Sequence, residues 1–290
     1  MPSEPEPGLH WLIQVGATTD QIATVGDPPK NLVQTVVRDD VHHENTVREH
    51  RVDGSAGDGA VTGIGSLNEK PLHAALKEWY RQEGDQVEAP LDGFVVDLVR
   101  GDLLIEIQTR GFSAMRRKFD RLLDAHTIRL VHPVAAMKWI VKLDDAGHEV
   151  SRKRSPKRGI AADVCGELVS FPSLLSHPNF ELEVALVEEE EIRRPDAKKG
   201  WRRGGFVIEE RRLVDVVETV AFDSPQALLG LLPDGLPDPF TTADLADGLG
   251  RSRHLGREVA YCLRVSGAVA TIGRDKRGIL YRLPGPGQQE

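Results

Sequence analysis

The stretch GFVVDLVRGDLLIEIQTR, residues 93–110, predicts two β-strands joined by a tight turn. The Gly-Asp pair at its centre is a favoured two-residue turn, so Arg100 should lie opposite Leu103. Counting back along both strands places Asp97 opposite Glu106, with Cβ atoms about 4.5–5.5 Å apart. Two carboxylates this close repel each other, and a divalent cation between them would remove the repulsion. We therefore predict a metal site on this hairpin.

The two faces of the second strand differ in polarity. Side chains alternate along a strand, so Glu106, Gln108 and Arg110 share one face. The opposite face is apolar from Leu103 to Ile107, and we assign it to the hydrophobic core. The polar face therefore holds the candidate site.

A helix is predicted upstream of the hairpin, in NEKPLHAALKEWYRQEG (residues 68–84). Pro71 suits the first turn of a helix, where a missing N–H costs nothing. The apolar stripe of this helix consists of Leu72, Leu76 and Trp79, with His73 and Tyr80 alongside. Glu69 falls on that stripe and should point toward the sheet, whereas Glu78 falls on the solvated side. Glu69 is therefore a third candidate carboxylate.

The segments after the hairpin complete an α/β pattern. SAMRRKFDRLLDAH (113–126) predicts a second helix, and TIRLVHPVAAMKWIVKLD (127–144) predicts two more strand-like runs. The order helix, strand, strand, helix, strand, strand is typical of an α/β layer with a mixed sheet. Residues 160–222 add a helical stretch and two further strand-like runs, and we expect them to complete a domain at 67–222.

A helix Glu, an Asp and a Glu-x-Gln on a hairpin, followed by a helix, resemble the PD-(D/E)XK (restriction-endonuclease-like) nuclease superfamily over residues 66–144. The resemblance implies a mixed sheet flanked by helices, and hydrolysis of phosphodiester bonds with Mg²⁺ or Mn²⁺ as cofactor. It implies that the metal is held by Asp97, Glu106, the backbone carbonyl of Ile107 and Glu69. Gln108 would occupy the position of the superfamily's lysine, which orients or activates the attacking water.

This chain departs from the superfamily's pattern at two positions. Val96 replaces the nominal proline, a position of little weight. Gln108 replaces the lysine, and an amide carries no charge and is not a base. Some restriction enzymes of the superfamily also have Glu-x-Gln, and a glutamine can still position a water whose pKa the metal lowers. The resemblance is therefore compatible with catalysis.

A second pattern, in residues 236–285, is typical of a winged helix-turn-helix domain. Thr241 or Thr242 can cap a short helix, and Ser252 can cap the next one, which a hairpin follows. Basic residues stand at the start of the second helix and at the hairpin tip, where such modules contact DNA: Arg251, Arg253, His254, Arg257, Arg274, Lys276 and Arg277. We expect DNA binding. The alternative is a protein-docking module whose charges only solvate a face.

The overall composition limits the function classes. The chain has 290 residues and a formal net charge of −8, so nucleic acid must be bound by local basic patches. A third patch, SRKRSPKRG (151–159), fits phosphate binding and a solvated charge run equally well. Cys165 and Cys262 are far apart in sequence, so we expect neither a disulfide framework nor a structural zinc site. We therefore expect the protein to be located in the reducing cytoplasm. No apolar run approaches the roughly 20 residues of a membrane span.

Residues 1–66 predict no folded domain. Pro and Gly clusters separate short apolar runs, and GSAGDGAVTGIGS (54–66) has the composition of a flexible linker. The acidic and histidine residues near position 45 show no spacing typical of metal ligands. We therefore expect a poorly ordered N-terminal extension.

The sequence thus favours a Mg²⁺-dependent nuclease that acts on DNA and is positioned by a winged helix. The second hypothesis is a catalytically inactive DNA-binding or regulatory protein on a nuclease fold. It is supported by Gln108, which replaces the lysine of the superfamily. The third is an RNA-processing nuclease. It has little support because aromatic residues make up only 5% of the chain, and single-strand binding relies on stacking. Whether the chain forms a homodimer stays open.

Overall fold

The computed structural model describes residues 70–196 and 198–285. The predicted N-terminal extension, residues 1–66, lies outside these residues, and so does Glu69. By its contacts, the whole of the described chain falls in one compact unit, Asn31–Glu290. No helix in the described part is long and apolar enough to cross a membrane.

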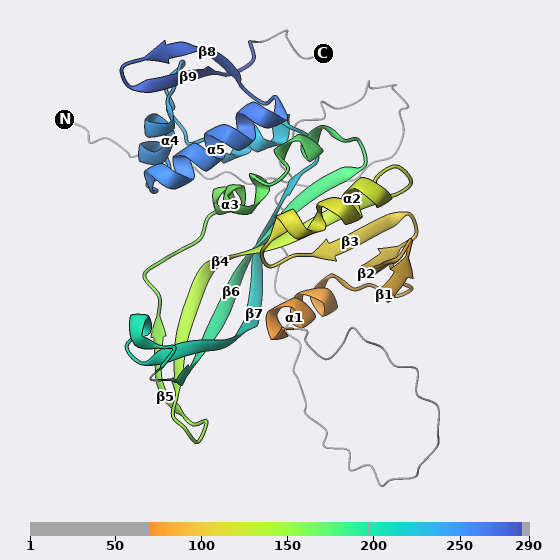
Figure 1. Cartoon of the computed structure of the whole chain (residues 1–290), viewed down its shortest axis with the longest axis vertical. Helices are drawn as coiled ribbons and strands as arrows, with labels where there is room; N and C mark the ends of the chain where they lie inside the picture. The colour runs from red at the N-terminus through yellow and green to blue at the C-terminus, as the bar shows by residue number, and fades with distance from the viewer. Residues whose placement is uncertain (1–69, 197, 286–290) are drawn as a thin grey trace, which may run out of the picture. The chain divides into compact units, whose positions relative to one another are not determined.

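The described residues form a large mixed sheet with helices on both faces, followed by a small helical module with a hairpin (Figure 1). In chain order the first part contains α1 (Pro71–Tyr80), β1 (Gln86–Leu91), β2 (Phe94–Arg100), β3 (Leu103–Ile107), the 3₁₀ helix η2 (Phe112–Met115), α2 (Arg116–Leu122), β4 (Thr127–Leu143), β5 (Glu149–Arg154), η3 (Ala161–Val164), α3 (Cys165–Leu168), η4 (Pro172–Ser176), β6 (Phe180–Pro195), η5 (Trp201–Arg203), β7 (Phe206–Phe222) and η6 (Gln226–Leu231). The second part contains α4 (Thr242–Gly248), α5 (Arg253–Ser266), β8 (Ala270–Asp275) and β9 (Gly278–Arg282).

The sheet runs in the order β1-β2-β3-β4-β6-β7, and β5 pairs with the outer part of β4. Strands β3, β4 and β6 are parallel, whereas β1-β2-β3 and β6-β7 pair antiparallel. This mixed sheet confirms the predicted α/β class. The two strand-like runs predicted in 127–144 are one strand of 17 residues, β4. Its pairing with β6 continues on both sides of an irregularity between Ala135 and Met137.

The β2–β3 hairpin has the predicted register. Its ladder runs from Arg100 opposite Leu103 to Leu98 opposite Ile105. A two-residue turn fixes the register of the pairs next to it, which explains why the register follows from the turn. The ladder ends one position before the two carboxylates on which the metal prediction rests.

Helix α1 buries a different stripe from the one predicted. It begins at the predicted proline, but its buried apolar face carries Leu72, Leu76 and Tyr80, and Trp79 is 37% exposed. The hydroxyl of Tyr80 donates a hydrogen bond of 2.5 Å to Glu183 on β6. The polar end of the Tyr80 ring is therefore satisfied inside the fold, at the contact between the helix and the sheet.

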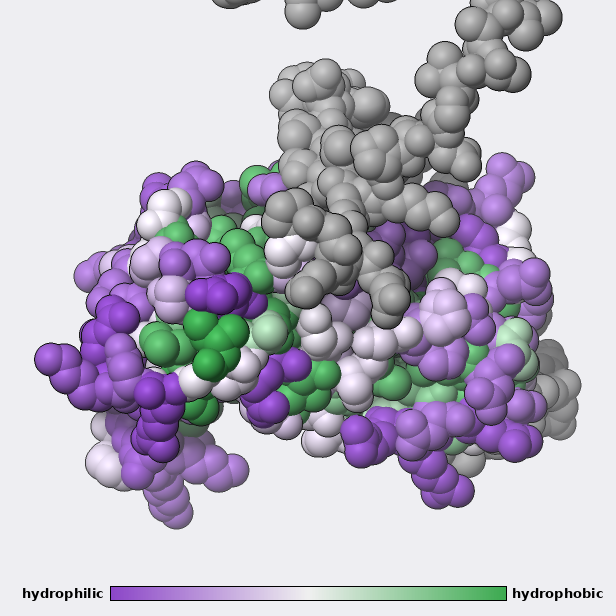
Figure 2. All heavy atoms as spheres, turned by 90° about the horizontal axis from the view of Figure 1, so that it is seen from above, coloured by the Kyte–Doolittle hydropathy of each residue, from purple (hydrophilic) through white to green (hydrophobic). Residues whose placement is uncertain are grey.

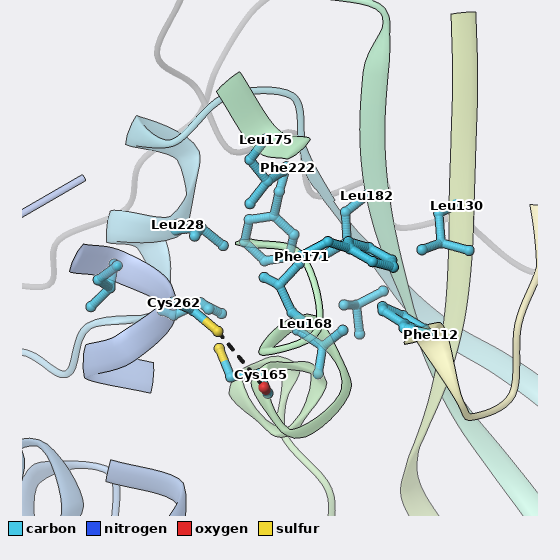
Figure 3. Packing of buried hydrophobic residues seen from close by; sticks show 14 of the residues in the cluster. Phe112, Leu130, Cys165, Leu168, Phe171, Leu175, Leu182, Phe222, Leu228 and Cys262 are labelled. Carbon is cyan, nitrogen blue, oxygen red and sulfur yellow. Dashed lines mark hydrogen bonds between the residues drawn. The ribbon is translucent and has the colours of Figure 1, made fainter. Parts of the chain in front are cut away.

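Hydrophobic residues pack on both faces of the sheet. On one face, α1 covers Ile105 and Ile107 of β3. The other face holds a larger cluster with helices α2, α3 and η4, in which the rings of Phe112 and Phe171 stack with centroids 5.5 Å apart (Figure 3). Because side chains alternate along a strand, Glu106 points to the α2 side of the sheet.

The C-terminal module contains the two predicted helices and the predicted hairpin. Thr241 caps α4 by accepting from the backbone N–H groups of Ala243 and Asp244, and Ser252 caps α5 by accepting from that of Leu255. Both predicted cap positions are confirmed, because capping depends only on residues within three positions. The assignment of this module as a winged helix stays a prediction.

Helix α5 packs against the sheet part of the chain. The thiol of Cys262 donates to the carbonyl of Cys165 at 3.7 Å, and the hydroxyl of Ser176 donates to the carbonyl of Ser266 at 3.3 Å. Figure 3 shows both sulfur atoms within the hydrophobic cluster. The two cysteines, distant in sequence, are neighbours in the fold and both are free thiols. The hydrophobic core therefore continues from the sheet into α5.

Candidate functional site

Asp97 lies where β2 leaves its regular pairing. The β2–β3 ladder ends at Leu98, and on the other side of β2 the residue opposite Asp97, Glu88, has a φ of +49°. Both irregularities remove Asp97 from the ladders. Its Oδ2 atom accepts the N–H of Ile107 at 2.8 Å and lies 3.2 Å from Nε2 of His73. A distorted strand thus presents this carboxylate between β3 and α1.

The surroundings of Asp97 favour its charged form. Its side chain is 17% exposed, and burial alone would raise its pKa. The hydrogen bond and charge of His73, together with the N–H of Ile107, outweigh burial and hold the pKa of Asp97 below its ordinary value. Asp97 therefore carries a negative charge at neutral pH.

Glu106 is buried and held by Lys118. The ammonium of Lys118, on α2, donates to Oε1 of Glu106 and, at 2.6 Å, to the backbone carbonyl of Val95. Burial raises the pKa of Glu106 to about 7; the charge of Lys118 opposes this shift and the charge of Asp97 adds to it. The two carboxylates are therefore close enough to repel each other electrostatically.

Lys118 is the functional candidate that sequence reasoning missed. It comes three residues after Met115 and four before Leu122, so it lies on the buried face of its helix. A lysine in that position must find a partner inside the fold, because an unpaired buried ammonium is costly. This helical phase was the signal available in the sequence.

Gln108 makes different contacts from those of Lys118. Its side-chain amide donates to the backbone carbonyl of Arg110 at 2.6 Å. Its own backbone carbonyl lies 2.7 Å from Nδ1 of His132, a buried ring that sequence reasoning also missed. The amide of Gln108 is thus engaged with the loop after β3, whereas the cation in contact with Glu106 is Lys118.

The donor atoms at this site suit a hard cation. Asp97 and Glu106 offer two carboxylates, and Ile107 would add a backbone carbonyl, which is the type of ligand that Mg²⁺ and Mn²⁺ prefer. Within residues 70–196 and 198–285, no three His, Cys, Asp or Glu side chains form a metal-binding group. The third predicted carboxylate, Glu69, lies outside that part. The described residues therefore offer two carboxylates as candidate metal ligands.

The predicted DNA-contacting side chains of the C-terminal module are mostly exposed. The exposed ones are Arg253, His254, Arg257, Arg274, Lys276 and Arg277. Three of them have acidic partners: Arg253 with Asp247, His254 with Glu258, and Arg277 with Asp275. Figure 2 shows hydrophilic side chains projecting from the side on which α4 and the β8–β9 turn lie in Figure 1. Three of the predicted DNA contacts form no ion pair within the described chain: Arg257, Arg274 and Lys276.

Arg251 differs from the other predicted contacts because it is partly buried. Its Nη2 atom donates to the backbone carbonyl of Arg158 at 2.6 Å. Arg158 belongs to the basic stretch 151–159. This hydrogen bond therefore brings two of the predicted basic patches side by side.

Comparison with known proteins gives a family and a relative. A protein of Treponema pallidum (strain Nichols), described as "Uncharacterized protein", is 30% identical over 225 residues, which cover 77% of this chain and 89% of the relative. No solved structure matches the chain significantly. The family described as "Domain of unknown function (DUF8091)" matches residues 70–223, which include the whole sheet and the site around Asp97. The chain therefore belongs to the DUF8091 family.

Proposed function

We propose that the chain is a Mg²⁺- or Mn²⁺-dependent nuclease that hydrolyses phosphodiester bonds of DNA, with the C-terminal module positioning the duplex. The observation that carries the proposal is the contact of Lys118 with Glu106 beside Asp97. Two carboxylates that repel each other suit a hard cation, and a lysine next to them suits a phosphate. Where β2 leaves its ladder, the carboxylate of Asp97 accepts the N–H of Ile107, the residue next to Glu106.

Each side chain of the site has a distinct task in this proposal. Asp97 and Glu106, with the carbonyl of Ile107, would hold the metal, which when bound would stabilise the charge that builds on the phosphate. Lys118 can donate hydrogen bonds without losing a proton, so it would orient the attacking water and neutralise a phosphate oxygen. His73 acts as a positioning residue, because its contact with Asp97 fixes that carboxylate.

Lys118 would supply the positive charge that Gln108 lacks. In the superfamily pattern that the sequence resembles, the lysine stands on the strand. Here the ammonium reaches Glu106 from α2, while the amide of Gln108 donates to Arg110. We therefore assign the orienting role to Lys118 rather than to Gln108.

A catalytically inactive DNA-binding or regulatory protein is the second candidate, and one observation favours it. Both carboxylates already have partners within the protein: Lys118 donates to Glu106, and His73 contacts Asp97. Such pairs compensate buried negative charge without a cation. In that case the site would be a structural network that ties α1 and α2 to the sheet.

Nicking of a supercoiled plasmid distinguishes the two candidates. We expect the wild-type protein to nick the plasmid with Mg²⁺ or Mn²⁺ and EDTA to abolish nicking. Asp97→Asn should remove nicking, while the matched control Glu78→Gln, at a carboxylate on α1 that is 74% exposed, should retain it. Equal background nicking by wild type and Asp97→Asn at every metal concentration overturns the nuclease assignment and leaves the regulatory candidate.

A further inference from the structure

A row of cations lies outside the candidate active site, between the sheet and the C-terminal module. It begins at the end of β5, follows the next loop and reaches the turn between α4 and α5. We call it the cationic strip, and it consists of Lys153, Arg154, Lys157, Arg158 and Arg251. The first four side chains are exposed and the fifth is partly buried.

Among the described residues, the cationic strip differs from neighbouring basic residues in its ion pairing. Neighbouring arginines have acidic partners, such as Arg152 with Glu190 at 2.9 Å and Arg253 with Asp247 at 3.4 Å. None of the five strip residues forms an ion pair with another residue of 70–196 or 198–285. The whole chain has 45 acidic and 37 basic residues, so the strip is a basic patch on a chain of net negative charge. Its concentration in one place favours a polyanionic partner.

The backbone of the cationic strip is fixed at both ends of its loop. The N–H of Ser155 donates to the carbonyl of Lys138 at 2.8 Å, and that of Gly159 donates to the carbonyl of Ala135 at 2.7 Å. A Cβ atom on Gly159 would lie 2.5 Å from Val134, so the loop packs closely on β4. The cations are therefore presented on a preorganised segment, which lowers the entropy cost of binding.

Arg251 connects the cationic strip to the start of α5. Its hydrogen bond to the carbonyl of Arg158 joins the two segments, and it directly precedes Ser252, the cap of α5. Figure 1 shows the segment after β5 leading back along the sheet to α3, which contacts α5. The strip therefore reaches the residue that precedes the cap of α5, and the exposed Arg257 lies in the first turns of the same helix.

We propose that the cationic strip is a second contact surface for the sugar-phosphate backbone of duplex DNA, continuous with the start of α5. The proposal rests on the proposed function in taking DNA as the partner. From residue 154 to residue 158 the chain spans at most about 14 Å. A duplex carries one charge per about 1.7 Å of its axis, so this length covers several phosphates. Such contacts position a duplex without reading its sequence.

The test measures duplex binding by the full-length protein across a salt series. EDTA is present so that no cleavage occurs, and fluorescence anisotropy follows a labelled duplex of about 40 base pairs, roughly four helical turns. The strip variant is Arg154→Ala/Lys157→Ala/Arg158→Ala. The matched control is Lys198→Ala/Lys199→Ala/Arg202→Ala, which removes three exposed cations from the turn between β6 and β7. The two variants therefore have the same net charge.

We expect only the strip variant to change the salt dependence. Each cation that no longer neutralises a phosphate should reduce the slope of log Kd against log salt by about 0.9, so the slope should fall by roughly two to three in the strip variant. The control should keep the wild-type slope. A single reversal, Lys157→Glu, should weaken binding in the same direction with a smaller change to the protein.

The outcomes separate the cationic strip from the proposed hydrolysis. Equal slopes for the strip and control variants overturn the proposal that the strip contacts DNA. The same strip dependence with duplex RNA of equal length overturns the assignment to DNA. Loss of binding in the strip variant together with no plasmid nicking by the wild type supports the strip and rejects hydrolysis. If the wild type does not bind the duplex at low salt, the proposal that the strip contacts DNA is wrong. Plasmid nicking still tests hydrolysis separately.

Discussion

Lys118 on α2 donates a hydrogen bond to Glu106 on β3, and the two side chains are only 10% and 5% exposed. This buried pair joins a helix to the strand beside Asp97. Without a bound cation, Lys118 compensates the charge of Glu106. A bound cation would share Glu106 with Lys118. More of the N–H groups of the Lys118 ammonium could then donate to a phosphate. Variants of this pair therefore distinguish the proposed nuclease from a catalytically inactive protein in which the pair is only structural.

Lys118→Met removes the ammonium and keeps an unbranched side chain. We expect plasmid nicking to fall to background, because no cation then orients the water or the phosphate. We also expect the free energy of unfolding to fall by about 2 kcal/mol, because Glu106 is left buried without its charged partner. The nicking assay and denaturant unfolding measure the two effects.

The double variant Lys118→Met/Glu106→Gln is the control for this prediction. It leaves no uncompensated buried charge, so it should recover most of the stability and stay inactive. Wild-type nicking by Lys118→Met would contradict the assigned role, and recovery of nicking by the double variant would contradict the need for both groups.

Gln108→Ala removes the amide that donates to the carbonyl of Arg110. We expect a smaller loss of nicking than in Lys118→Met, and unchanged Mg²⁺ affinity, because the amide contacts the loop rather than a carboxylate. Gln108→Lys should keep or raise nicking, since it adds positive charge near the site. Cleavage rates compared side by side check this order. A larger loss in Gln108→Ala than in Lys118→Met would return the orienting role to Gln108.

Local rules predicted the parts of this structure that depend on residues close in sequence. A two-residue turn sets the register of its hairpin, so Leu98 lies opposite Ile105 as expected. Caps depend on residues within three positions, so Thr241 and Ser252 were found from the sequence alone. The same register predicted Asp97 opposite Glu106, but the ladder ends at Leu98, and Asp97 accepts the N–H of Ile107 instead of pairing with Glu106.

Contacts that depend on tertiary packing were not predictable in this way. The partner of Lys118 is set by how α2 lies on the sheet, and its helical phase showed only that some buried partner was needed. The buried stripe of α1 includes Tyr80, whose hydroxyl donates to Glu183 on a distant strand, whereas Trp79 is 37% exposed. The proximity of the two cysteines likewise results from the packing of α5 on α3.

Mg²⁺ affinity should increase with pH through the neutral range. Burial raises the pKa of Glu106 from 4.5 to about 7, so below that pH the metal-free site holds a proton that a cation must displace. A raised pKa means that protonation stabilises the folded metal-free protein at low pH, and this contribution is lost as pH rises through about 7. Asp97, with its lowered pKa, stays charged throughout.

Titration calorimetry between about pH 6 and pH 8 checks this dependence. The affinity of the wild type should change about tenfold per pH unit below the pKa of Glu106 and level off above it. Glu106→Gln should bind weakly and without this pH dependence. A flat profile for the wild type would show that Glu106 does not ligate the cation.

Arg257→Glu should weaken duplex binding without changing Mg²⁺ affinity. Its side chain is exposed in the first turns of α5, so charge reversal acts on phosphate contacts rather than on the fold. The matched control is Arg264→Glu, a position that is also exposed and lies two turns further along the same helix face. We expect Kd to rise about tenfold for Arg257→Glu, a loss of about 1.4 kcal/mol, and to change little for the control. Equal effects of both reversals would show that only net charge matters, and the start of α5 would then have no special role in binding DNA.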